Sequence, residues 1–329
     1  MKSLSAVCAT FAAGLAAWIA SGFAAPAAAD TFPSRTITLV VAYAPGGTGD
    51  LVARVVSDKL ARALGQSVVV ENRAGAGGAI ATRSVIASPP DGHTLLVGQT
   101  GEISITPHWN KAAGYDPEKD LQPVALATIV PLALVAPGNT PYSTVAEMLK
   151  AAAAGGGLSF ASAGAGTPGH FAGEVLKLRT RTNLAHVPYK GAGPALNDLL
   201  GGHVDFFFSG LPAAVPLVRA GKLKLLAVST GTRSSFAPEV PTVAEASGIA
   251  DFDIGLWQGF FAPHGTPSDI VLRLNTEINR ILMEPDVKGN LVDAGAEVVT
   301  MSVAQFEEFV KTEVVKFATI VKDASIKPE

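Results

Sequence analysis

The chain has 329 residues, 48% of them hydrophobic and 16% charged, and its formal net charge is −3. Its 25 Lys and Arg residues are spread among 28 Asp and Glu without a basic stripe, which gives no support for nucleic-acid binding. Beyond the N-terminal segment there is no run of about 18 uninterrupted apolar residues, so we expect no membrane-spanning helix there.

The N-terminal 29 residues predict a secretory signal peptide. A positive start precedes an apolar stretch over 4–23, and Ala27 and Ala29 match the small-x-small rule for cleavage. We therefore expect cleavage after Ala29 and export of the remaining chain. A membrane anchor is the alternative, which the small residues interrupting the stretch disfavour. Cys8, the only cysteine, lies early in this stretch, so we expect no lipid anchor, and no disulfide or thiolate metal site in the mature chain.

The first part of the exported chain alternates apolar runs with glycine-rich corners. Apolar residues on one face predict a helix over 50–64. A second helix follows the glycines at 75–78 and ends before the turn residues 89–92. Strands are predicted at 37–43, 67–71 and 94–97.

The later part of the chain repeats this order. The segment 124–136 predicts two short strands joined near Val130 and Pro131, and further strand–corner–helix units follow. Alternating strands and helices are typical of parallel sheets with helices on both faces, so the predicted fold class is α/β. Strands are predicted at 158–161, 184–187, 204–208 and 223–229, and helices at 169–178, 195–200, 270–282 and 303–322.

The length of the exported chain, about 300 residues, suggests two domains. No low-complexity linker separates them, which favours domains that exchange the chain. We predict two crossing strands, one near Val124–Thr128 and one near Leu223–Ser229, so that the first domain contains both ends of the chain.

The corner AYAPGGTGD, residues 42–50, follows the first predicted strand. In parallel α/β sheets, ligands bind beyond the carboxyl ends of strands, where helix N-termini present free N–H groups and a partial positive charge. Gly47 and its neighbouring glycines let the backbone approach a ligand, Thr48 offers a hydroxyl and Asp50 can cap the helix. No lysine follows as in a phosphate-binding loop, so nucleotide hydrolysis is not expected. A plain tight turn is the alternative for any single corner.

The corner SAGAGTPGH, residues 162–170, carries more polar groups. Thr167 is placed as an N-cap with Pro168 at the first helical position. His170 falls in the first turn, where the positive helix end favours a neutral ring that can bind a ligand; a histidine bonded to a turn carbonyl is the alternative. Ser162 and His170 also suggest a secreted serine hydrolase, but the glycine that a nucleophile elbow needs is absent.

Two further corners carry charged or aromatic residues. Tyr189 could cover an apolar ligand and Lys190 could neutralise an acid, although a solvated lysine is the common alternative. Glu102 follows Thr100 and Gly101. Facing a ligand, it would disfavour a second carboxylate and favour an amine or amide; its alternative role is a first-turn acid beside a helix dipole. The six histidines show no His-x-x-x-His pair and no acidic cluster, so we expect neither a metal nor a cofactor.

Long segments in order along the chain match one known family: PSRTITLVVAYAPGGTGDLVAR, VVVENRAGAGGAIATRSV, PPDGHTLLVG, SFASAGAGTPGHFAGEVLK, HVPYKGAGPALNDLLGGHVDFFF and WQGFFAPHGTP. Through them the chain resembles the Bug family, the extracytoplasmic solute receptors of tripartite tricarboxylate transporters. The resemblance implies a type II periplasmic-binding-protein fold, with two parallel-sheet lobes joined by two crossing strands. Residues 30–128 and 229–329 would form lobe one and residues 129–228 lobe two.

The resemblance also implies the ligand-binding positions, which lie between the lobes. Tyr43 stands where the family usually has phenylalanine, and Glu102 is a charge where the family is usually small or neutral. Asp205 and Ser209 are the weaker matches. The implied ligand-binding residues are Tyr43, Gly47, Thr48, Asp50, Thr100, Gly101, Glu102, Ser162, Thr167, His170, Tyr189, Lys190, Gly191, Asp205 and Ser209.

The implied function is that of a periplasmic receptor. It would hold a small organic acid, or a related amide or amino acid, and deliver it to the permease subunits of a tripartite tricarboxylate-type transporter. A ligand that contacts both lobes favours the closed state, and closure expels water and strengthens its hydrogen bonds. The alternatives are a receptor for a signalling system and the secreted serine hydrolase. We expect a monomer.

Overall fold

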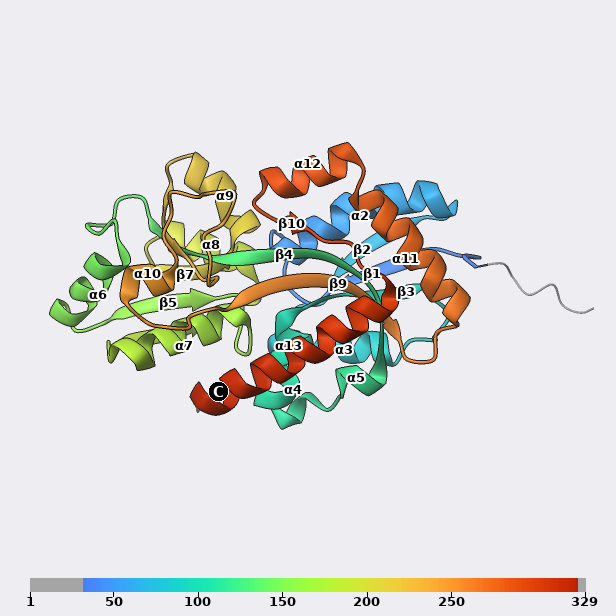
Figure 1. Ribbon diagram of the computed structural model, residues 1–329, viewed down its shortest axis with the longest axis horizontal. Helices are drawn as coiled ribbons and strands as arrows, with labels where there is room; N and C mark the ends of the chain where they lie inside the picture. The colour runs from blue at the N-terminus through green and yellow to red at the C-terminus, as the bar shows by residue number, and fades with distance from the viewer. Residues whose placement is uncertain (1–31, 325–329) are drawn as a thin grey trace, which may run out of the picture.

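The computed structural model describes residues 32–324, so the predicted signal peptide, residues 1–29, lies outside the described residues. Strands and helices form an elongated molecule with two ends (Figure 1). The strands are β1 (Ile37–Val41), β2 (Val68–Asn72), β3 (Thr94–Gln99), β4 (Leu121–Pro137), β5 (Leu158–Ser162), β6 (Leu184–Pro188), β7 (Phe206–Gly210), β8 (Leu223–Val228), β9 (Gly255–Pro263) and β10 (Glu297–Val298).

Helices lie against this sheet along its length (Figure 1). They are α2 (Thr48–Leu64), η1 (Ala76–Gly78), α3 (Ala79–Ile86), η2 (Gly101–Ile105), α4 (Thr106–Trp109), η3 (Lys111–Ala113), α5 (Pro117–Asp120), α6 (Val145–Ala154), α7 (Pro168–Thr180), α8 (Ala192–Leu200), α9 (Leu211–Arg219), α10 (Val243–Ser247), α11 (Ser268–Leu282), α12 (Pro285–Asp293) and α13 (Val303–Ala324). No helix within residues 32–324 is long and apolar enough to cross a membrane.

The sheet follows the order β2-β1-β3-β9-β4-β7-β5-β6, and β8 and β10 also pair with β4. At one end β1 pairs in parallel with β2 and β3, and at the other β5 pairs in parallel with β6 and β7. The long strands β4 and β9 run antiparallel to their neighbours between these ends. We call the end with β1, β2 and β3 the first half and the end with β5, β6 and β7 the second half.

The strand β4 passes from one half to the other without a break. Its residues 121–131 pair with β9, and from Leu132 onward it pairs with β7 and β8. The prediction of two short strands within 124–136 was therefore wrong. Pro131 stands where β4 changes partner, so its missing N–H does not interrupt a continuous ladder.

The second long strand is β9 and not Leu223–Ser229, which corrects that prediction. Leu223–Val228 forms β8, which pairs with residues 133–137 of β4 in the second half. The chain then forms α10, which packs on α6 and β8, before β9 pairs with β3 and β4. The lobe boundaries at residues 128/129 and 228/229 stay a prediction.

Burial explains why the predicted units form. In β1 four of the five residues are fully buried, as expected for a strand covered on both faces. In α2 the buried residues Val52, Val56 and Leu60 recur at helical spacing and face the sheet. The strand and helix predictions from 37–43 to 94–97 and from 158–161 to 195–200 agree with the structure within a few residues at each end.

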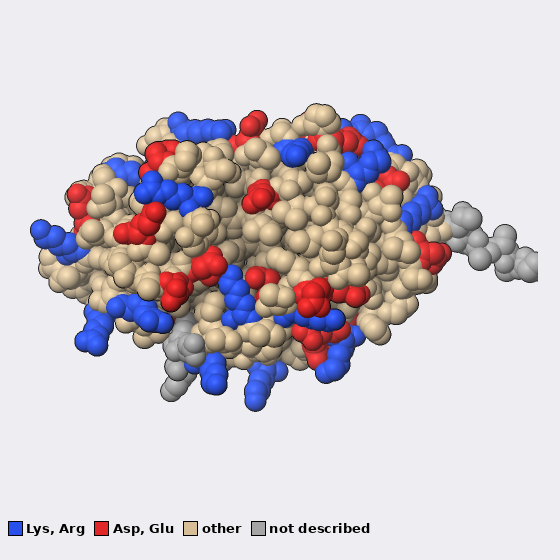
Figure 2. All heavy atoms as spheres, in the orientation of Figure 1, with Lys and Arg blue, Asp and Glu red and all other residues tan. Residues whose placement is uncertain are grey.

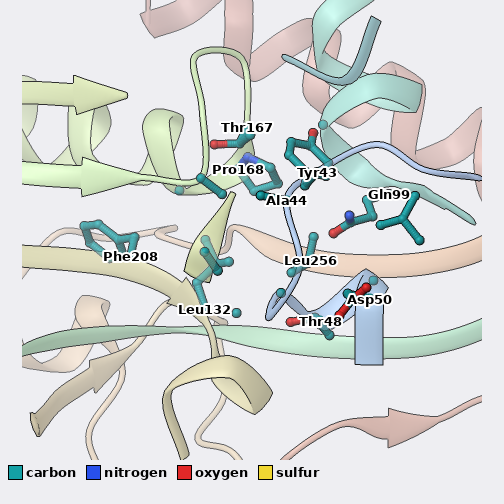
Figure 3. Close-up of a pocket in the computed structure, with 18 residues that line it drawn as sticks. Tyr43, Ala44, Thr48, Asp50, Gln99, Leu132, Thr167, Pro168, Phe208 and Leu256 are labelled. Atoms are coloured by element: carbon teal, nitrogen blue, oxygen red, sulfur yellow. The ribbon is translucent and has the colours of Figure 1, made fainter. Parts of the chain in front are cut away.

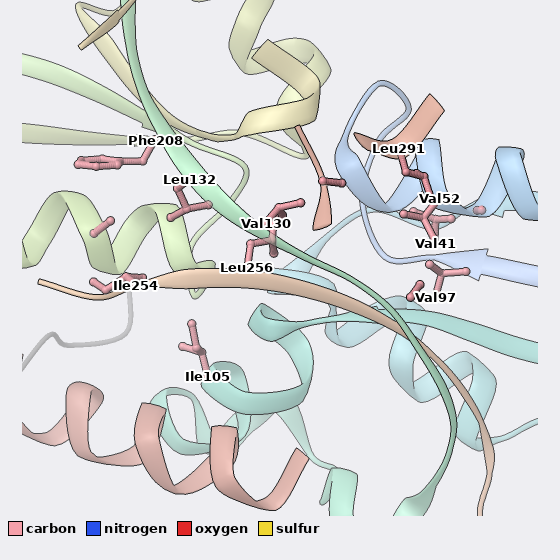
Figure 4. Packing of buried hydrophobic residues seen from close by; sticks show 14 of the residues in the cluster. Val41, Val52, Val97, Ile105, Val130, Leu132, Phe208, Ile254, Leu256 and Leu291 are labelled. Atoms are coloured by element: carbon pink, nitrogen blue, oxygen red, sulfur yellow. The ribbon is translucent and has the colours of Figure 1, made fainter. Parts of the chain in front are cut away.

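An apolar core cluster runs through both halves, beside two smaller clusters. Val130 and Leu132 of β4 lie beside Leu256 of β9 at its centre, with Val41 and Phe208 toward the two ends (Figure 4). The long strands thus form a floor of aliphatic side chains between the halves. On the surface, acidic and basic side chains are interspersed over the face seen in Figure 2.

Candidate functional site

A pocket with an empty volume of ≈ 530 Å³ lies between the two halves. Its floor is Leu132 of β4 and Leu256 of β9. Figure 3 shows Phe208 and Leu132 at one side and Gln99 and Asp50 at the other. The remaining lining residues are Val41, Tyr43, Ala44, Gly47, Thr48, Gly49 and Gly101 from the first half, and Ala163, Thr167, Pro168, Gly169, Ala192 and Gly210 from the second.

The N-termini of three helices open into this pocket. Thr48 begins α2, Pro168 begins α7 and Ala192 begins α8, and all three residues line it. In none of these helices does the side chain of the N-cap residue accept a hydrogen bond from the first turn. Since the first-turn N–H groups have no intrahelical acceptor, donors and partial positive charge converge from both halves on one space. This arrangement suits an anion.

In both α2 and α7, the side chain of the third helical residue accepts a hydrogen bond from a backbone N–H of the corner before the helix. The Gly46 N–H donates to Asp50 Oδ2 at 3.1 Å, and the Gly166 N–H donates to His170 Nδ1 at 3.2 Å. Each side chain thereby fixes the turn ahead of its helix. Asp50 was predicted as a possible cap, but the N-cap is Gly47. Thr167 is the N-cap of α7, as predicted.

The Asp50 carboxylate is held by hydrogen bonds from three neighbouring residues, Gly46, Arg54 and Asn72. Asn72 Nδ2 donates to Asp50 Oδ1 at 3.0 Å, and the Arg54 guanidinium bonds both carboxylate oxygens at 3.0 Å. Burial alone would raise the pKa of Asp50, but the bonds from Arg54, Gly46 and Asn72 outweigh it and lower the pKa. Among the described residues that line the pocket, Asp50 is the only one with a formal charge.

Tyr43 lines the pocket, and its hydroxyl is hydrogen-bonded to a residue outside the pocket lining. Tyr43 Oη donates to Glu102 Oε2 at 2.8 Å, and the Gln99 N–H donates to Glu102 Oε1 at 2.8 Å. Glu102 has no exposed surface and does not line the pocket. Burial raises the pKa of Glu102 to about 8, against the opposing effect of these hydrogen bonds. Glu102 therefore orients Tyr43 from the interior.

Two polar side chains in the pocket have no partner. Among the described residues, neither the Thr48 hydroxyl nor the Gln99 side-chain amide has a hydrogen bond, although only 4% and 7% of these residues is exposed. Thr48 was predicted as a site residue and Gln99 was not. The signal for Gln99 was its place at the carboxyl end of a strand, next to the corner at Thr100 and Gly101.

Ser162 and His170 lie in the interior and not in the pocket lining. Ser162 Oγ is 2.7 Å from His186 Nε2, and the His170 and His186 rings stack at 4.0 Å between centroids. Burial, and to a smaller extent His186, lowers the pKa of His170 to about 3. The ring is therefore neutral, as predicted, but the main cause is burial and not the positive helix end. The serine hydrolase alternative was wrong, because Ser162 has no exposed surface at which it could reach a substrate.

Tyr189 and Lys190 lie at a second pocket of ≈ 580 Å³, which shares Tyr43 and Ala163 with the first. Tyr189 Oη donates to Asp198 Oδ2 at 2.8 Å, so its hydroxyl is held by α8. The Lys190 side chain is exposed at the rim.

Four other predicted residues lie outside the pocket lining. The Thr100 hydroxyl accepts from the Trp257 N–H at 2.9 Å, and Ser209 Oγ donates to its neighbour's carbonyl. The Asp205 carboxylate accepts from the Ser159 N–H at 2.7 Å, within the second half. Gly191 is the N-cap of α8 and packs against Ala44.

The two halves touch across the pocket. The Ala44 N–H donates to the Lys190 carbonyl at 2.8 Å. A Cβ placed on Gly193 of α8 would lie 2.4 Å from the Pro45 carbonyl oxygen of the first half. These close backbone contacts show that the two halves are closed over the pocket. Within residues 32–324 no group of three or more His, Cys, Asp or Glu side chains could hold a metal ion.

The chain is similar in sequence to a known family of transport receptors. The family model for the tripartite tricarboxylate transporter family receptor matches residues 52–326. Protein BugT of Bordetella pertussis is 36% identical over 313 residues, which cover 93% of this chain and 94% of that protein.

Two solved structures from Rhodopseudomonas palustris are also similar. MatC, solved with malate, is 36% identical with a TM-score of 0.82, covering 88% of this chain and 100% of that one. A protein solved with adipate is 34% identical with a TM-score of 0.86, covering 91% and 100%. With the two-ended sheet and the pocket between its halves, these matches show that the chain belongs to the Bug family, the receptors of tripartite tricarboxylate transporters, which are periplasmic solute-binding proteins and not enzymes.

Proposed function

We propose that this receptor captures a small organic carboxylate between its two halves and delivers it to the permease subunits of a tripartite tricarboxylate-type transporter. The observation that carries the proposal is the convergence of the N-termini of α2, α7 and α8 on one pocket. Helix N-termini bind anions through backbone N–H groups without a lysine or arginine.

The pocket supports a small ligand that is held by both halves. Thr48 and Gly49 come from the first half, and Thr167 and Gly169 from the second. A ligand in contact with both stabilises the closed arrangement relative to an open one, and the permease can then recognise the closed form. Relatives solved with malate and adipate support a carboxylate as the chemical class.

Calorimetry tests this function. Purified, folded receptor is titrated with a panel of mono- and dicarboxylates and with the corresponding primary amides and alcohols. We expect at least one carboxylate to bind with a dissociation constant in the micromolar range or below, about 8 kcal/mol of binding free energy, and its amide to bind far more weakly. Equal binding of acid and amide would contradict anion recognition.

Delivery needs a separate test. Receptor loaded with the ligand found by calorimetry is incubated with membranes that carry the cognate permease, and retention is compared with unloaded receptor. The proposal expects retention of the loaded form alone. Retention on a sensor kinase, with none on the permease, would instead favour a signalling receptor.

A further inference from the structure

The N-termini of α2 and α7 face the pocket from opposite halves, but they are not electrically equivalent. The first turn of α2 contains Asp50, whereas the first turn of α7 contains no acidic residue. His170 occupies the matching position in α7, and burial keeps its ring neutral. The partial positive charge of α7 is therefore left uncompensated, while that of α2 already has a carboxylate beside it.

Asp50 keeps its negative charge in the folded protein. Its oxygens accept from Gly46, Asn72 and Arg54, and these bonds lower the pKa of the carboxyl group. The Arg54 side chain that balances this charge is 55% exposed and does not line the pocket. An anionic group on this side of the pocket would lie near a fixed carboxylate, without a cation in the lining.

The same side of the pocket carries the unpartnered side chains of Thr48 and Gln99. A hydroxyl and a primary amide each offer a donor and an acceptor, and both residues are more than nine-tenths buried. A ligand group that hydrogen-bonds both side chains therefore gains affinity over a group that cannot. A neutral hydrogen-bonding group on the ligand is complementary to both. The rest of the wall, including Leu132 and Leu256, is aliphatic.

We propose that the ligand is a monocarboxylate with a neutral hydrogen-bonding substituent, such as a hydroxyl, at its other end. Its carboxylate faces the N-terminus of α7, and its neutral end is read by Gln99 and Thr48. This inference rests on the proposed carboxylate-binding function and specifies the ligand class of that site.

Calorimetry with matched ligands tests the inference. One series is butanoate, 4-hydroxybutanoate and succinate; a second is benzoate, 4-hydroxybenzoate and terephthalate. Within at least one series, the hydroxy acid should bind about tenfold tighter than the parent acid, the effect of roughly one net hydrogen bond, and the dicarboxylate should bind weakest.

Variants of Gln99 and Thr48 test whether these residues cause the preference for the hydroxy acid over the parent acid. Gln99→Leu should reduce the preference for the hydroxy acid over the parent acid to within about twofold, since the amide is lost while the volume is nearly kept. Thr48→Val should reduce it partly. Gln122→Leu is the matched control, because Gln122 bonds Glu307 away from the pocket, and it should keep the wild-type preference.

The outcomes separate this inference from the proposed function. If succinate or terephthalate binds tighter than its hydroxy acid, or if Gln99→Leu keeps the full preference, the inference is overturned while carboxylate binding stands. If folded wild-type receptor binds none of the six acids and none of the wider panel, both fail.

Discussion

Glu102 is a carboxyl group in the interior whose pKa burial raises to about 8. Between the ordinary value of 4.5 and about 8, the folded protein holds a proton that the unfolded chain has released. The stability that this group contributes is therefore present below pH 4.5 and is lost as the pH rises toward 8, at a slope of at most about 1.4 kcal/mol per pH unit.

Glu102→Gln removes this proton and keeps the shape of the side chain. We expect the melting temperature of the variant, measured from pH 5 to 8.5, to decline less toward alkaline pH than that of the wild type, because the raised pKa of Glu313 remains. The melting temperature of the wild type minus that of the variant should thus fall as the pH rises. His170 cannot produce this trend, because its lowered pKa of about 3 costs stability as the pH falls below 6.5. A constant difference across the range would show that Glu102 titrates normally.

Asp50→Ala leaves several donors without their acceptor. The Gly46 N–H and the Asn72 amide both lose a bond to this carboxylate. The sequence alone predicts that Asp50→Ala weakens ligand binding without unfolding the protein. From these contacts we expect weaker binding together with a loss of about 1–3 kcal/mol in unfolding free energy. Urea unfolding measures the loss, and Asp50→Asn should recover part of it. Unchanged stability would show that the corner holds its shape without Asp50.

Residues next to a glycine corner could be assigned to the pocket lining from the sequence. Gly47, Thr48 and Thr167 line the pocket, because the corner itself places them at the end of a strand. Assignment from the sequence failed where position depends on long-range packing. Leu132 and Leu256 reach the pocket only because β4 and β9 cross beneath it, and no local pattern encodes that crossing.

At the level of elements, the two long strands are joined by a buried side-chain hydrogen bond. Thr128 Oγ1 of β4 donates to Gln258 Oε1 of β9, and both residues have no exposed surface. Thr128→Val leaves the Gln258 carbonyl unsatisfied in the interior, which should cost about 1–3 kcal/mol of unfolding free energy.

The double variant Thr128→Val with Gln258→Leu removes both polar partners. It should be more stable than the single variant, since no buried group is then left unsatisfied. Chemical denaturation of the wild type and three variants gives the coupling energy. A coupling energy near zero would mean that the bond does not tie β4 to β9.

The strand–corner–helix units could be predicted from sequence because their apolar periodicity is local. The strand β9 escaped prediction for the opposite reason. Its sequence contains Gly255, Gln258 and Gly259, and it becomes a strand through pairing with β3 and β4 on its two sides. The helix α9 carries Pro216 in its interior, a residue that argues against a helix on propensity alone.

For the whole molecule, closure depends on close backbone contact between the halves. A Cβ on Gly193 would lie 2.4 Å from the Pro45 carbonyl oxygen, while Gly193 itself lies within helix α8. Gly193→Ala should therefore hold the halves apart without harming the second half. We expect the melting temperature to be unchanged or higher, because alanine favours a helix by about 0.5–1 kcal/mol, and ligand affinity to fall.

Small-angle X-ray scattering gives the readout of closure for Gly193→Ala. Ligand should reduce the radius of gyration of the wild type and have a smaller effect on the variant. Gly289→Ala is the control, since a Cβ there meets nothing within 4 Å and the residue lies in helix α12. Equal affinity and equal compaction in Gly193→Ala and the wild type would contradict closure by this contact.

A crystal structure with the tightest-binding carboxylate from calorimetry tests the central claim most directly. The account predicts the ligand between the halves, with a carboxylate oxygen about 2.7–3.2 Å from the Gly169 N–H at the start of α7. It also predicts that the halves contact each other, as Ala44 and Lys190 do here. A ligand bound on an outer surface, or within one half alone, would contradict it.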